Sequence, residues 1–578
     1  ILENENQQQI ASTKSDHAGA FSFLNVPSGP LFVLVQEAQF APVRIEVPAG
    51  DSDITKLQIT LKIAEVKESV VVTVTRSERS LADQPASVSL INEQQIEQTP
   101  ANSMDDVLRT VPSVNLPMVS SYQVHPTANS ISMRGLGGIR ALVLLDGVPI
   151  NDPFFGYLQW SRVSMESVDR VEVVRGGGSP LWGNYAMGGV INIITRPPDK
   201  TDFKVEAGYG RFDTYRANGT ADYVVNDTFK LRAVVDTWGT NGFDQVPPDA
   251  GPIYVPTTFD GRNIGASAYL TPDSNWHGSF NFNFHDNDQT LLTPLSTNDQ
   301  QIYDLAGNFV RNFEHSDLTI SGFYEHSHFV TDNTGTPDGV EIGFGEFLQN
   351  RHTTPVDSTG ASANWTMPMD GVIRLLTFGT DMQLISGEDS AQIFDESGTQ
   401  IRTDIGRGKQ FFLGGFGQID IFPSENFEIL ASARIQNVRN YDGFDGVGGL
   451  GNVPDNSDVS FDPRVSIHYN ITSQFALRGA AYTSFRAPNL DNLYRAFSVP
   501  FGIFEPNAQL KPEKLKGGEL GFDIYQSSLA FQFTGYISEI EDLLTYRNLD
   551  FSELPPGFFF GSRNINAGKA RAQGVEAT

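Results

Sequence analysis

Few residues in the chain have the types and spacing that bond-making chemistry needs. His326 and His328 share one face of a strand and have the spacing of two metal ligands, but no third ligand is near them. The run Gly176, Gly177 and Gly178 lacks the Lys-Ser/Thr of a phosphate-binding loop. There is no HExxH or GxSxG pattern, and with no Cys there is no thiol nucleophile. We therefore predict a binding protein, not an enzyme, with no metal site or cofactor of its own.

The balance of charge argues against a nucleic-acid partner. Lys and Arg total 40 against 69 Asp and Glu, a net charge of −29, whereas nucleic-acid-binding domains carry clustered basic charge. Two acidic pairs, Asp286 with Asp288 and Glu388 with Asp389, fall in predicted loops. We expect solvated loop charge there, with a calcium ion that orders the loops as the alternative.

A glycine-dense stretch from Ile131 to Pro197 predicts a compact domain. Three short apolar strands are expected in it, at Ala141–Leu145, Val171–Val174 and Val190–Ile194. A helix capped by Ser103 is expected before this stretch, with Asp105 and Asp106 in its first turn and Pro112 at its end.

From residue 202 onward the pattern alternates. Phe427, Ile429, Ala431, Ala433 and Ile435 occupy one parity, while the other parity is mostly polar. Each such strand has one apolar and one polar face, and lengths of about ten residues or more suit a tilted crossing of a bilayer. The 41 Phe and 17 Tyr supply aromatic girdles.

Short turns alternate with long connections, as in outer-membrane barrels. The short turns are expected at 226–227, 271–273, 314–315, 368–370, 423–425, 472–473 and 526–527, and the long loops at 239–260, 286–304, 332–356, 387–408, 437–457, 487–516 and 548–570. The fold class is thus mainly β: a large antiparallel transmembrane β-barrel, plugged by a small α+β domain and preceded by a small β-sandwich. About sixteen strands are expected against 22 in plugged transporters, so we expect a C-terminally truncated 22-stranded type.

At this point the motifs resemble a known family, the TonB-dependent outer-membrane receptors. The plug motifs are Ile131-Ser132-Met133-Arg134-Gly135, Leu144-Leu145-Asp146-Gly147, Arg170-Val171-Glu172-Val173-Val174-Arg175-Gly176, and Trp182-Gly183 through Gly188-Gly189 to Asn192. The barrel motifs are Ser484-Phe485-Arg486-Ala487-Pro488-Asn489-Leu490, Leu510-Lys511-Pro512-Glu513, Glu519-Leu520-Gly521 and Gly574-Val575-Glu576.

The resemblance implies four parts. Residues 1–64 resemble part of a carboxypeptidase-regulatory-like β-sandwich, 65–78 hold the TonB box and linker, 79–199 form the plug domain, and 200–578 form the barrel, incomplete at its C-terminus. The first residue is Ile, so we expect an N-terminus that has been cut.

The resemblance also implies functional residues. The TonB box is Glu68-Ser69-Val70-Val71-Val72-Thr73-Val74, which would pair with TonB by strand addition. The plug motif residues are Gly135, Asp146, Gly147, Glu172, Gly176, Gly183, Gly188, Gly189 and Asn192. A plug–barrel lock would bring Arg134 and Arg175 near Glu519 and Glu576, since lumenal charge needs a partner. Ligand-binding candidates are the loop aromatics Phe154, Phe155, Tyr157, Phe243, Tyr254, Phe497, Phe501 and Phe504, although girdle aromatics would also account for them.

The expected function is TonB-dependent uptake across the outer membrane of a Gram-negative bacterium. The transported ligand would be a ferric siderophore or a cobalamin-like metal chelate, with haem or an oligosaccharide as alternatives. The partners would be TonB with its inner-membrane energising complex and outer-membrane lipid, and the N-terminal domain would lie in the periplasm. A passive porin or adhesin barrel, and a secreted all-β enzyme or lectin, are the competing interpretations. Neither of them requires a plug or a TonB box.

Overall fold

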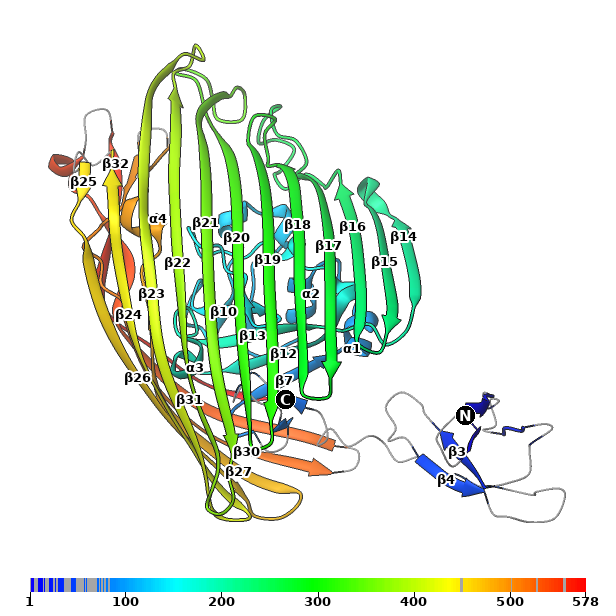
Figure 1. Ribbon diagram of the computed structural model, residues 1–578. Coiled ribbons are helices and arrows are strands. Elements are labelled where there is room, and N and C mark those ends of the chain that lie inside the picture. The colour runs from blue at the N-terminus through cyan, green and yellow to red at the C-terminus, as the bar shows by residue number, and fades with distance from the viewer. Residues whose placement is uncertain are drawn as a thin grey trace.

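The computed structural model describes residues 84–446, 451–499, 502–526, 529–554 and 558–578 continuously. Before residue 84 it describes 2–4, 9–13, 15, 20–23, 26, 30–35, 43–47, 57, 59, 70–71, 73, 76 and 79–81. Figure 1 shows a tall barrel wall around a smaller domain, with the N-terminal strands apart from both.

The N-terminal strands form one four-stranded sheet of order β2-β1-β3-β4. They are β1 (Leu2–Asn4), β2 (Gln9–Ala11), β3 (Leu31–Val35) and β4 (Val43–Val47). Leu2, Leu31 and Val33 are its buried residues. The expected strand at 56–63 lies mostly outside the described residues, so the sandwich stays a prediction.

The plug is a five-stranded sheet of order β11-β10-β13-β12-β7. Its strands are β7 (Val88–Asn92), β10 (Ala141–Leu145), β11 (Val148–Pro149), β12 (Val168–Arg175) and β13 (Gly189–Thr195). The three predicted strands are confirmed as β10 and as parts of β12 and β13. The short strands β5 (Val70–Val71) with β6 (Arg79–Ser80), and β8 (Val114–Asn115) with β9 (Ser132–Met133), make two further ladders.

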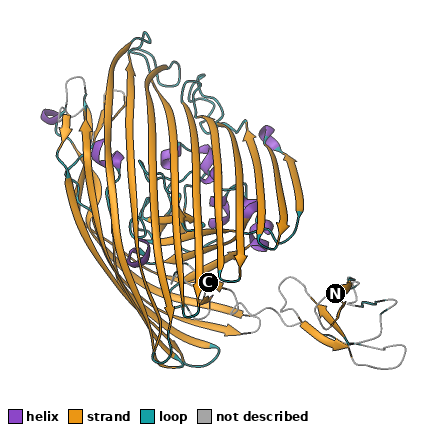
Figure 2. Cartoon of the chain, in the orientation of Figure 1, coloured by secondary structure: helices purple, strands orange, loops and turns teal. Residues whose placement is uncertain are grey.

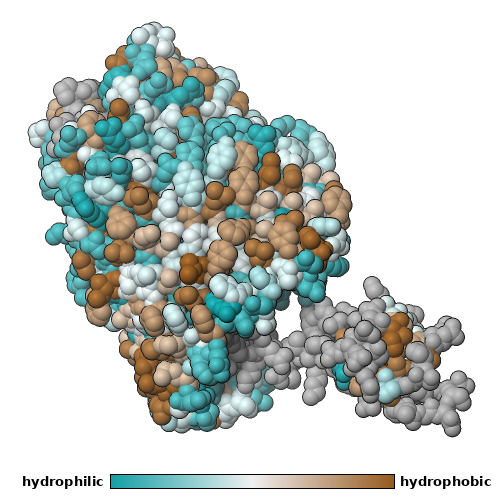
Figure 3. All heavy atoms as spheres, in the orientation of Figure 1, coloured by the Kyte–Doolittle hydropathy of each residue, from teal (hydrophilic) through white to brown (hydrophobic). Residues whose placement is uncertain are grey.

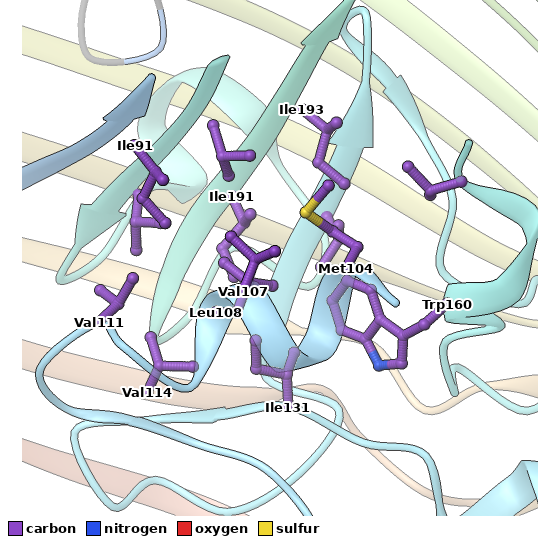
Figure 4. Packing of buried hydrophobic residues seen from close by; sticks show 14 of the residues in the cluster. Ile91, Met104, Val107, Leu108, Val111, Val114, Ile131, Trp160, Ile191 and Ile193 are labelled. Atoms are coloured by element: carbon purple, nitrogen blue, oxygen red, sulfur yellow. The ribbon is translucent and has the colours of Figure 1, made fainter. Parts of the chain in front are cut away.

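The plug also contains short helices. They are α1 (Glu93–Gln98), α2 (Met104–Leu108), α3 (Ser179–Trp182) and the 3-10 turns η3 (Ser121–Gln123), η4 (Pro126–Ala128), η5 (Trp160–Arg162) and η6 (Met165–Ser167). Ser103 precedes α2 as expected, but its hydroxyl donates to Asp105 and caps no backbone amide. Figure 4 shows Met104 and Leu108 of α2 packed with Trp160 against Ile191 and Ile193 of β13. This apolar layer holds the plug together.

The barrel wall is one sheet that runs in chain order from β14 to β32. The long strands are β14 (Asp202–Tyr209), β15 (Tyr215–Asn226), β16 (Phe229–Thr240), β17 (Thr258–Asp273), β18 (Trp276–Thr290), β19 (Thr297–Phe313), β20 (Ser316–Gly335), β21 (Phe347–Pro368), β22 (Ile373–Phe394), β23 (Gln400–Ser424), β24 (Phe427–Asp445), β26 (Asn456–Asn470), β27 (Phe475–Arg486), β30 (Glu513–Gln526), β31 (Leu529–Asn548) and β32 (Phe560–Ala577). Short additions are β25 (Gly451–Val453), β28 (Phe497–Val499), β29 (Gly502–Glu505), α4 (Leu490–Tyr494), η7 (Arg211–Asp213) and η8 (Phe551–Glu553). Within the described residues, β14 and β32 are not paired with each other. Figure 2 shows how completely strand dominates the wall.

The predicted parity is confirmed in the wall. On β24, Ile435 is 59% exposed on the outer face and Arg434 is 1% exposed in the lumen. Val575 and Glu576 on β32 split in the same way, at 69% and 6%. Figure 3 shows apolar side chains gathered in a band across the outer face. This band is the surface that meets lipid.

Several predicted loops are largely wrong. The segments 286–304, 332–356, 387–408 and 437–457 consist mostly of strand, because the strands from β18 to β24 continue well beyond the apolar band. In these extensions both faces are polar, so the alternation that marks a membrane strand is absent while backbone pairing goes on. The predicted short turns at 226–227, 314–315, 368–370, 423–425 and 472–473 overlap the observed turns. The turn expected at 271–273 lies in β17, and the chain turns at 274–275 instead. Of the turn expected at 526–527, Gln526 ends β30 and residue 527 lies outside the described residues. No helix in the described part of the chain is long and apolar enough to cross a membrane.

Candidate functional site

Arg134 joins the plug to two strands of the wall. Its backbone φ of 53° makes the turn after β9. Its Nη1 donates to Glu519 Oε2 on β30 at 2.5 Å, and its Nε and Nη2 donate to Glu576 on β32 at 3.0 and 2.8 Å. All three side chains are buried. Burial lowers the pKa of Arg134, but the two carboxylates outweigh it and raise the pKa overall, so the guanidinium stays charged.

Arg175 does not share this lock equally. Its Nε lies 3.9 Å from Glu576 Oε1, whereas its hydrogen bonds go to the carbonyl of Pro112 and the hydroxyls of Ser87 and Ser89. Burial lowers its pKa to about 10, against the opposing effect of Glu576. Arg175 therefore braces the plug from within, and Arg134 carries the direct link to the wall.

Glycine at two plug motif positions lets backbone and wall come together. At Gly176, with φ of 86°, an added Cβ would lie 2.9 Å from the Tyr482 hydroxyl and 3.2 Å from Arg134 Nη1. At Gly189 it would lie 2.4 Å from the carbonyl oxygen of Val174 on the paired strand. Any side chain at either position would push the plug off the wall or open its sheet.

The other plug motif residues shape turns within the plug. Asp146 accepts from the amide and the hydroxyl of Thr195, each at 2.8 Å, and Asn192 accepts from the amide of Gly147 at 3.3 Å. Positive φ angles occur at Gly135, Gly147 and Gly183, and Gly188 donates to the carbonyl of Arg140 at 2.7 Å.

Two further buried ion-pair clusters were not foreseen. Arg140 donates to both oxygens of Glu513 on β30, which also accepts from Arg486. Arg162 pairs with Asp304 at 2.6 Å and Glu325 at 2.8 Å on β19 and β20. The lumenal parity of the acids was a signal in the sequence, but their plug partners lie 142 to 373 residues away in the chain and no local pattern names them.

Two described residues, Thr73 near the end of the predicted TonB box and Arg76 just after it, are docked inside the barrel. Thr73 donates from its amide and hydroxyl to Glu172 Oε2 at 2.8 and 2.5 Å, and its carbonyl accepts from Trp182 at 2.9 Å. Arg76 donates to Asn364 on β21 at 2.7 Å and lies 3.9 Å from Asp381 on β22.

Within the predicted box, Val70 and Val71 pair with Arg79 and Ser80 as β5 and β6. Glu68, Ser69, Val72 and Val74 lie outside the described residues. The limits of the box therefore stay a prediction.

The predicted ligand-binding aromatics do not form an open pocket. Phe154, Phe155 and Tyr157 are buried in an apolar cluster with Phe329 and with Leu493 of α4. Asn489, the N-cap of α4, donates to the carbonyl of Phe155 at 2.5 Å. These aromatics lie in a plug loop between β11 and β12 and bury each other, because exposing three rings at once is costly.

The remaining candidates are scattered. Phe243 is exposed and packs on Phe212, and Tyr254 is half-buried. The rings of Phe497 and Phe504 are tilted against each other, with centroids 6.0 Å apart. Phe501 lies outside the described residues.

The loop that carries α4 is tied down inside the barrel mouth. Arg495 Nε lies 3.2 Å from Asp389, which also accepts from His352 and Thr354 of β21. Tyr494 fills a notch between two strands: an added Cβ at Gly408 on β23 would lie 2.3 Å from its ring, and one at Gly443 on β24 would lie 2.6 Å from it. The glycines thus make a socket for Tyr494.

We found no group of three or more metal-ligating side chains in the described part of the chain.

Removing one partner of the Arg134 lock should be costly. We expect Glu576→Gln or Arg134→Met to lower the free energy of plug unfolding by about 3 kcal/mol, because each leaves buried charge unpaired. Arg571→Met on the same strand is the control, since its ion pair with Glu539 is exposed and worth about 0–1 kcal/mol. Urea unfolding of the full chain, followed by tryptophan fluorescence, measures both. If Arg571→Met lowered the free energy of unfolding as much as Glu576→Gln or Arg134→Met does, the Arg134 ion pairs would not stabilise the plug as expected.

The Tyr494 socket predicts that alanine substitutions at two glycines of β23 differ sharply in their effect on protease sensitivity. Gly408→Ala should expel the ring and make segment 487–512 roughly ten-fold more sensitive to protease, since its Cβ meets the ring well inside contact distance. Gly417→Ala, whose Cβ would be 3.9 Å from its nearest neighbour, should not. Similar cleavage rates in both variants would rule out the socket.

The buried carboxyl of Asp152 predicts that the stability of the chain depends on pH. It is buried and accepts from the amides of Phe154 and Phe155 at 2.9 and 2.7 Å, yet burial raises its pKa from 3.8 to about 6. Its contribution to stability is therefore full below about pH 4 and is lost as the pH rises through about 6. Asp152→Asn keeps an acceptor for both amides. Unfolding between pH 4 and 7 should show a flatter profile for this variant than for the unmodified chain, and parallel profiles would refute the assignment.

Comparison with known proteins covers both parts of this arrangement. Residues 80–190 match the TonB-dependent Receptor Plug Domain family, and residues 201–578 match the TonB dependent receptor-like beta-barrel family. A relative named Vitamin B12 transporter BtuB, from Photobacterium profundum, is 24% identical over 522 residues, which are 88% of this chain and 75% of the relative.

Solved structures share the fold. The FpvAI–pyocin S2 complex superposes with a TM-score of 0.70 at 16% identity, over 94% of this chain and 74% of that one. The siderophore receptor PirA from Pseudomonas aeruginosa gives 0.62 at 18% identity, over 85% and 81%. With its plug inside a β-barrel and family matches across both, this chain belongs to the TonB-dependent receptors of the outer membrane.

Proposed function

We propose that the chain takes up a bulky metal chelate of the cobalamin or ferric-siderophore class, powered by TonB. The observation that carries the proposal is the docked segment of Thr73 and Arg76, which joins the predicted TonB box to plug and wall at once. A pull on the box would reach these contacts before any other part of the plug.

The ligand class is supported by the relatives. Several carry the name Vitamin B12 transporter BtuB, and structural neighbours include siderophore receptors. Both names denote chelates too large for a narrow pore. The plug inside the wall, with residues of α4 packed on Phe154 and Phe155, also favours gated uptake over a passive porin.

The proposed cycle makes and breaks no covalent bond. Ligand binds outside and displaces the α4 loop, whose ties to Asp389 and to the glycine socket are non-covalent. TonB adds a strand to residues 68–74 and draws the segment towards the periplasm with energy from its inner-membrane complex. The contacts of Thr73 with Glu172 and of Arg76 with Asp381 then break first.

Transport assays with a proline variant test the proposal. Val71→Pro removes a backbone donor and should block strand addition, whereas Val71→Thr keeps a β-branched strand former. Cells with the proline variant should bind but not accumulate one of four probes: cyanocobalamin, ferrichrome, ferric enterobactin or haemin. Cells with the threonine variant should accumulate it, and cells lacking TonB should not.

Two outcomes would contradict the proposal. Accumulation that survives both Val71→Pro and the loss of TonB would make the chain a passive pore. Accumulation of a maltodextrin, with none of the four probes taken up, would keep TonB coupling and reject the ligand class.

A further inference from the structure

The ladder between β26 and β27 stops partway up the wall. Its paired positions end at Arg464 opposite Tyr482. The ladders on either side, β24 with β26 and β27 with β30, continue beyond this point to the outer ends of β26 and β27. Among the described residues, 456–463 of β26 and 483–486 of β27 therefore have no strand partner across the gap. We call this unpaired stretch the seam.

A proline explains where the pairing ends. In the register of the paired part, the next position upward would set Pro463 opposite Thr483. Proline has no N–H to donate to a ladder, and in sheets it is confined to edges and bulges. The seam lies within the lipid-facing band, since Val459 and Phe461 are 64% and 62% exposed on the outer face of β26. Unpaired backbone is costly in lipid, so other groups must close the seam.

One segment of the plug, residues 177–184, closes the seam, and we call it the clasp. The Ser179 hydroxyl accepts from the amide of Phe485 at 3.3 Å and donates to the carbonyl of Phe485 at 3.4 Å. These are the two bonds that a partner residue on a neighbouring strand would make. The Asn184 side chain accepts from the amide of Ala487 at 3.0 Å. The clasp thus holds the outer end of β27 in place of a strand.

The same clasp also holds the edge of β26. Arg464 Nη1 donates to the carbonyl of Gly177 at 2.9 Å. Gly177 lies close against β27, because an added Cβ would be 2.4 Å from the hydroxyl of Ser484. A direct bond crosses the seam as well, from the hydroxyl of Thr483 to the carboxylate of Asp462 at 3.2 Å. Both edges of the seam therefore depend on side chains and on the plug, not on a backbone ladder.

The clasp is weaker than the bonds that fasten the plug elsewhere. It acts through hydrogen bonds to backbone groups, and those of Ser179 are long, whereas Arg134 and Arg140 reach β30 and β32 through buried ion pairs. Beside the seam, Arg464 Nη2 and Glu519 Oε1 face each other at 3.8 Å, too far apart for a hydrogen bond. Moving β26 away from β27 would break the clasp and leave the plug fastened to β30 and β32.

The seam is connected to the outer mouth, because β27 leads directly into the α4 loop, residues 487–512. Ala487, which Asn184 holds, is the first residue of that loop. Phe485 lies in the same apolar cluster as Phe154 and Leu493. Displacement of the α4 loop by a ligand would therefore pull directly on the two residues that the clasp holds.

We propose that the seam is a joint in the wall, which the clasp holds closed and which opens when the α4 loop is displaced. β26 and β27 then separate in the outer half of the bilayer, and the lumen widens while the plug stays fastened through Arg134 and Arg140. A bulky ligand needs such room, since a fully paired ladder fixes the diameter of a barrel. The inference rests on the proposed function for its ligand and on the clasp contacts for the joint.

Distances across the seam test the joint without a ligand. The chain has no Cys, so Phe461→Cys with Lys514→Cys introduces two sites for spin labels, both in the row of Phe485. In the full chain in lipid nanodiscs, adding Ser179→Ala and Asn184→Ala should lengthen the distance between the labels by about 5 Å, one strand spacing. Double electron–electron resonance measures this distance.

A matched label pair and a matched variant are the controls. Ile467→Cys with Leu520→Cys spans the paired part of the same strands, and its distance should not change. Ser167→Ala removes a hydroxyl that bonds within the plug and should change neither distance. An unchanged distance across the seam after both clasp side chains are removed would overturn the joint.

A disulfide across the seam tests what the joint does. Asp462→Cys with Thr483→Cys, at side chains that are in contact, should fix the seam and lower accumulation of the transported probe roughly ten-fold, and dithiothreitol should restore it. Val465→Cys with Ala481→Cys joins positions that are already paired and should leave accumulation normal. Normal accumulation with the seam fixed would overturn the joint. If the unmodified chain accumulates none of the four probes, the proposed function fails instead, and the spin-label distances still decide the joint.

Discussion

A charge buried between two bodies must be paired across the boundary, and this constraint fixes the plug in the wall. Arg134 is sealed from water, and the carboxylates that neutralise it, Glu519 and Glu576, belong to strands more than 380 residues further along the chain. Separating plug from wall at this point would leave an uncompensated guanidinium and two uncompensated carboxylates. Because that state costs several kcal/mol, the plug keeps one position in the lumen.

The ion pairs between plug and wall are unevenly distributed around the plug. This distribution decides which contacts break first under a pull. Arg134 and Arg140 fasten the plug to β30 and β32, and Arg162 fastens it to β19 and β20. Towards β21 and β22, the described residues Thr73 and Arg76 make hydrogen bonds, contacts with aromatic rings and one long ion pair. A pull from the linker side meets these weaker contacts first. Gating by a small segment is therefore compatible with a plug that stays bound.

Features that follow from a repeating pattern, or from the position of one side chain within it, can be predicted from the sequence. Alternation over ten or more residues identifies the wall strands, and the parity of Glu519 and Glu576 within that alternation is enough to place both in the lumen. Alternation cannot predict contacts set by tertiary packing. Arg175 and Arg134 each precede a glycine at a strand end, yet one is turned into the plug and the other towards the wall.

Other features could not be predicted from the sequence for the same reason, because tertiary packing determines them and leaves no local pattern. The wall strands continue where both faces are polar, so the alternation ends before the backbone pairing does. The aromatic residues Phe154, Phe155 and Tyr157 resemble a ligand surface in the sequence, but they are buried because α4 folds over them. The socket for Tyr494 depends on glycines of two neighbouring strands, and their spacing carries no local signal.

The central claim is that the linker leaves before the plug does. Single-molecule pulling on the full chain in a lipid bilayer, with the handle attached just before residue 68, tests it most directly. The contacts of the linker and of the plug predict a first release no longer than the segment up to residue 84, followed by a rise in force while residues 88–198 stay in place. Extraction of the whole plug in the first event would contradict the claim.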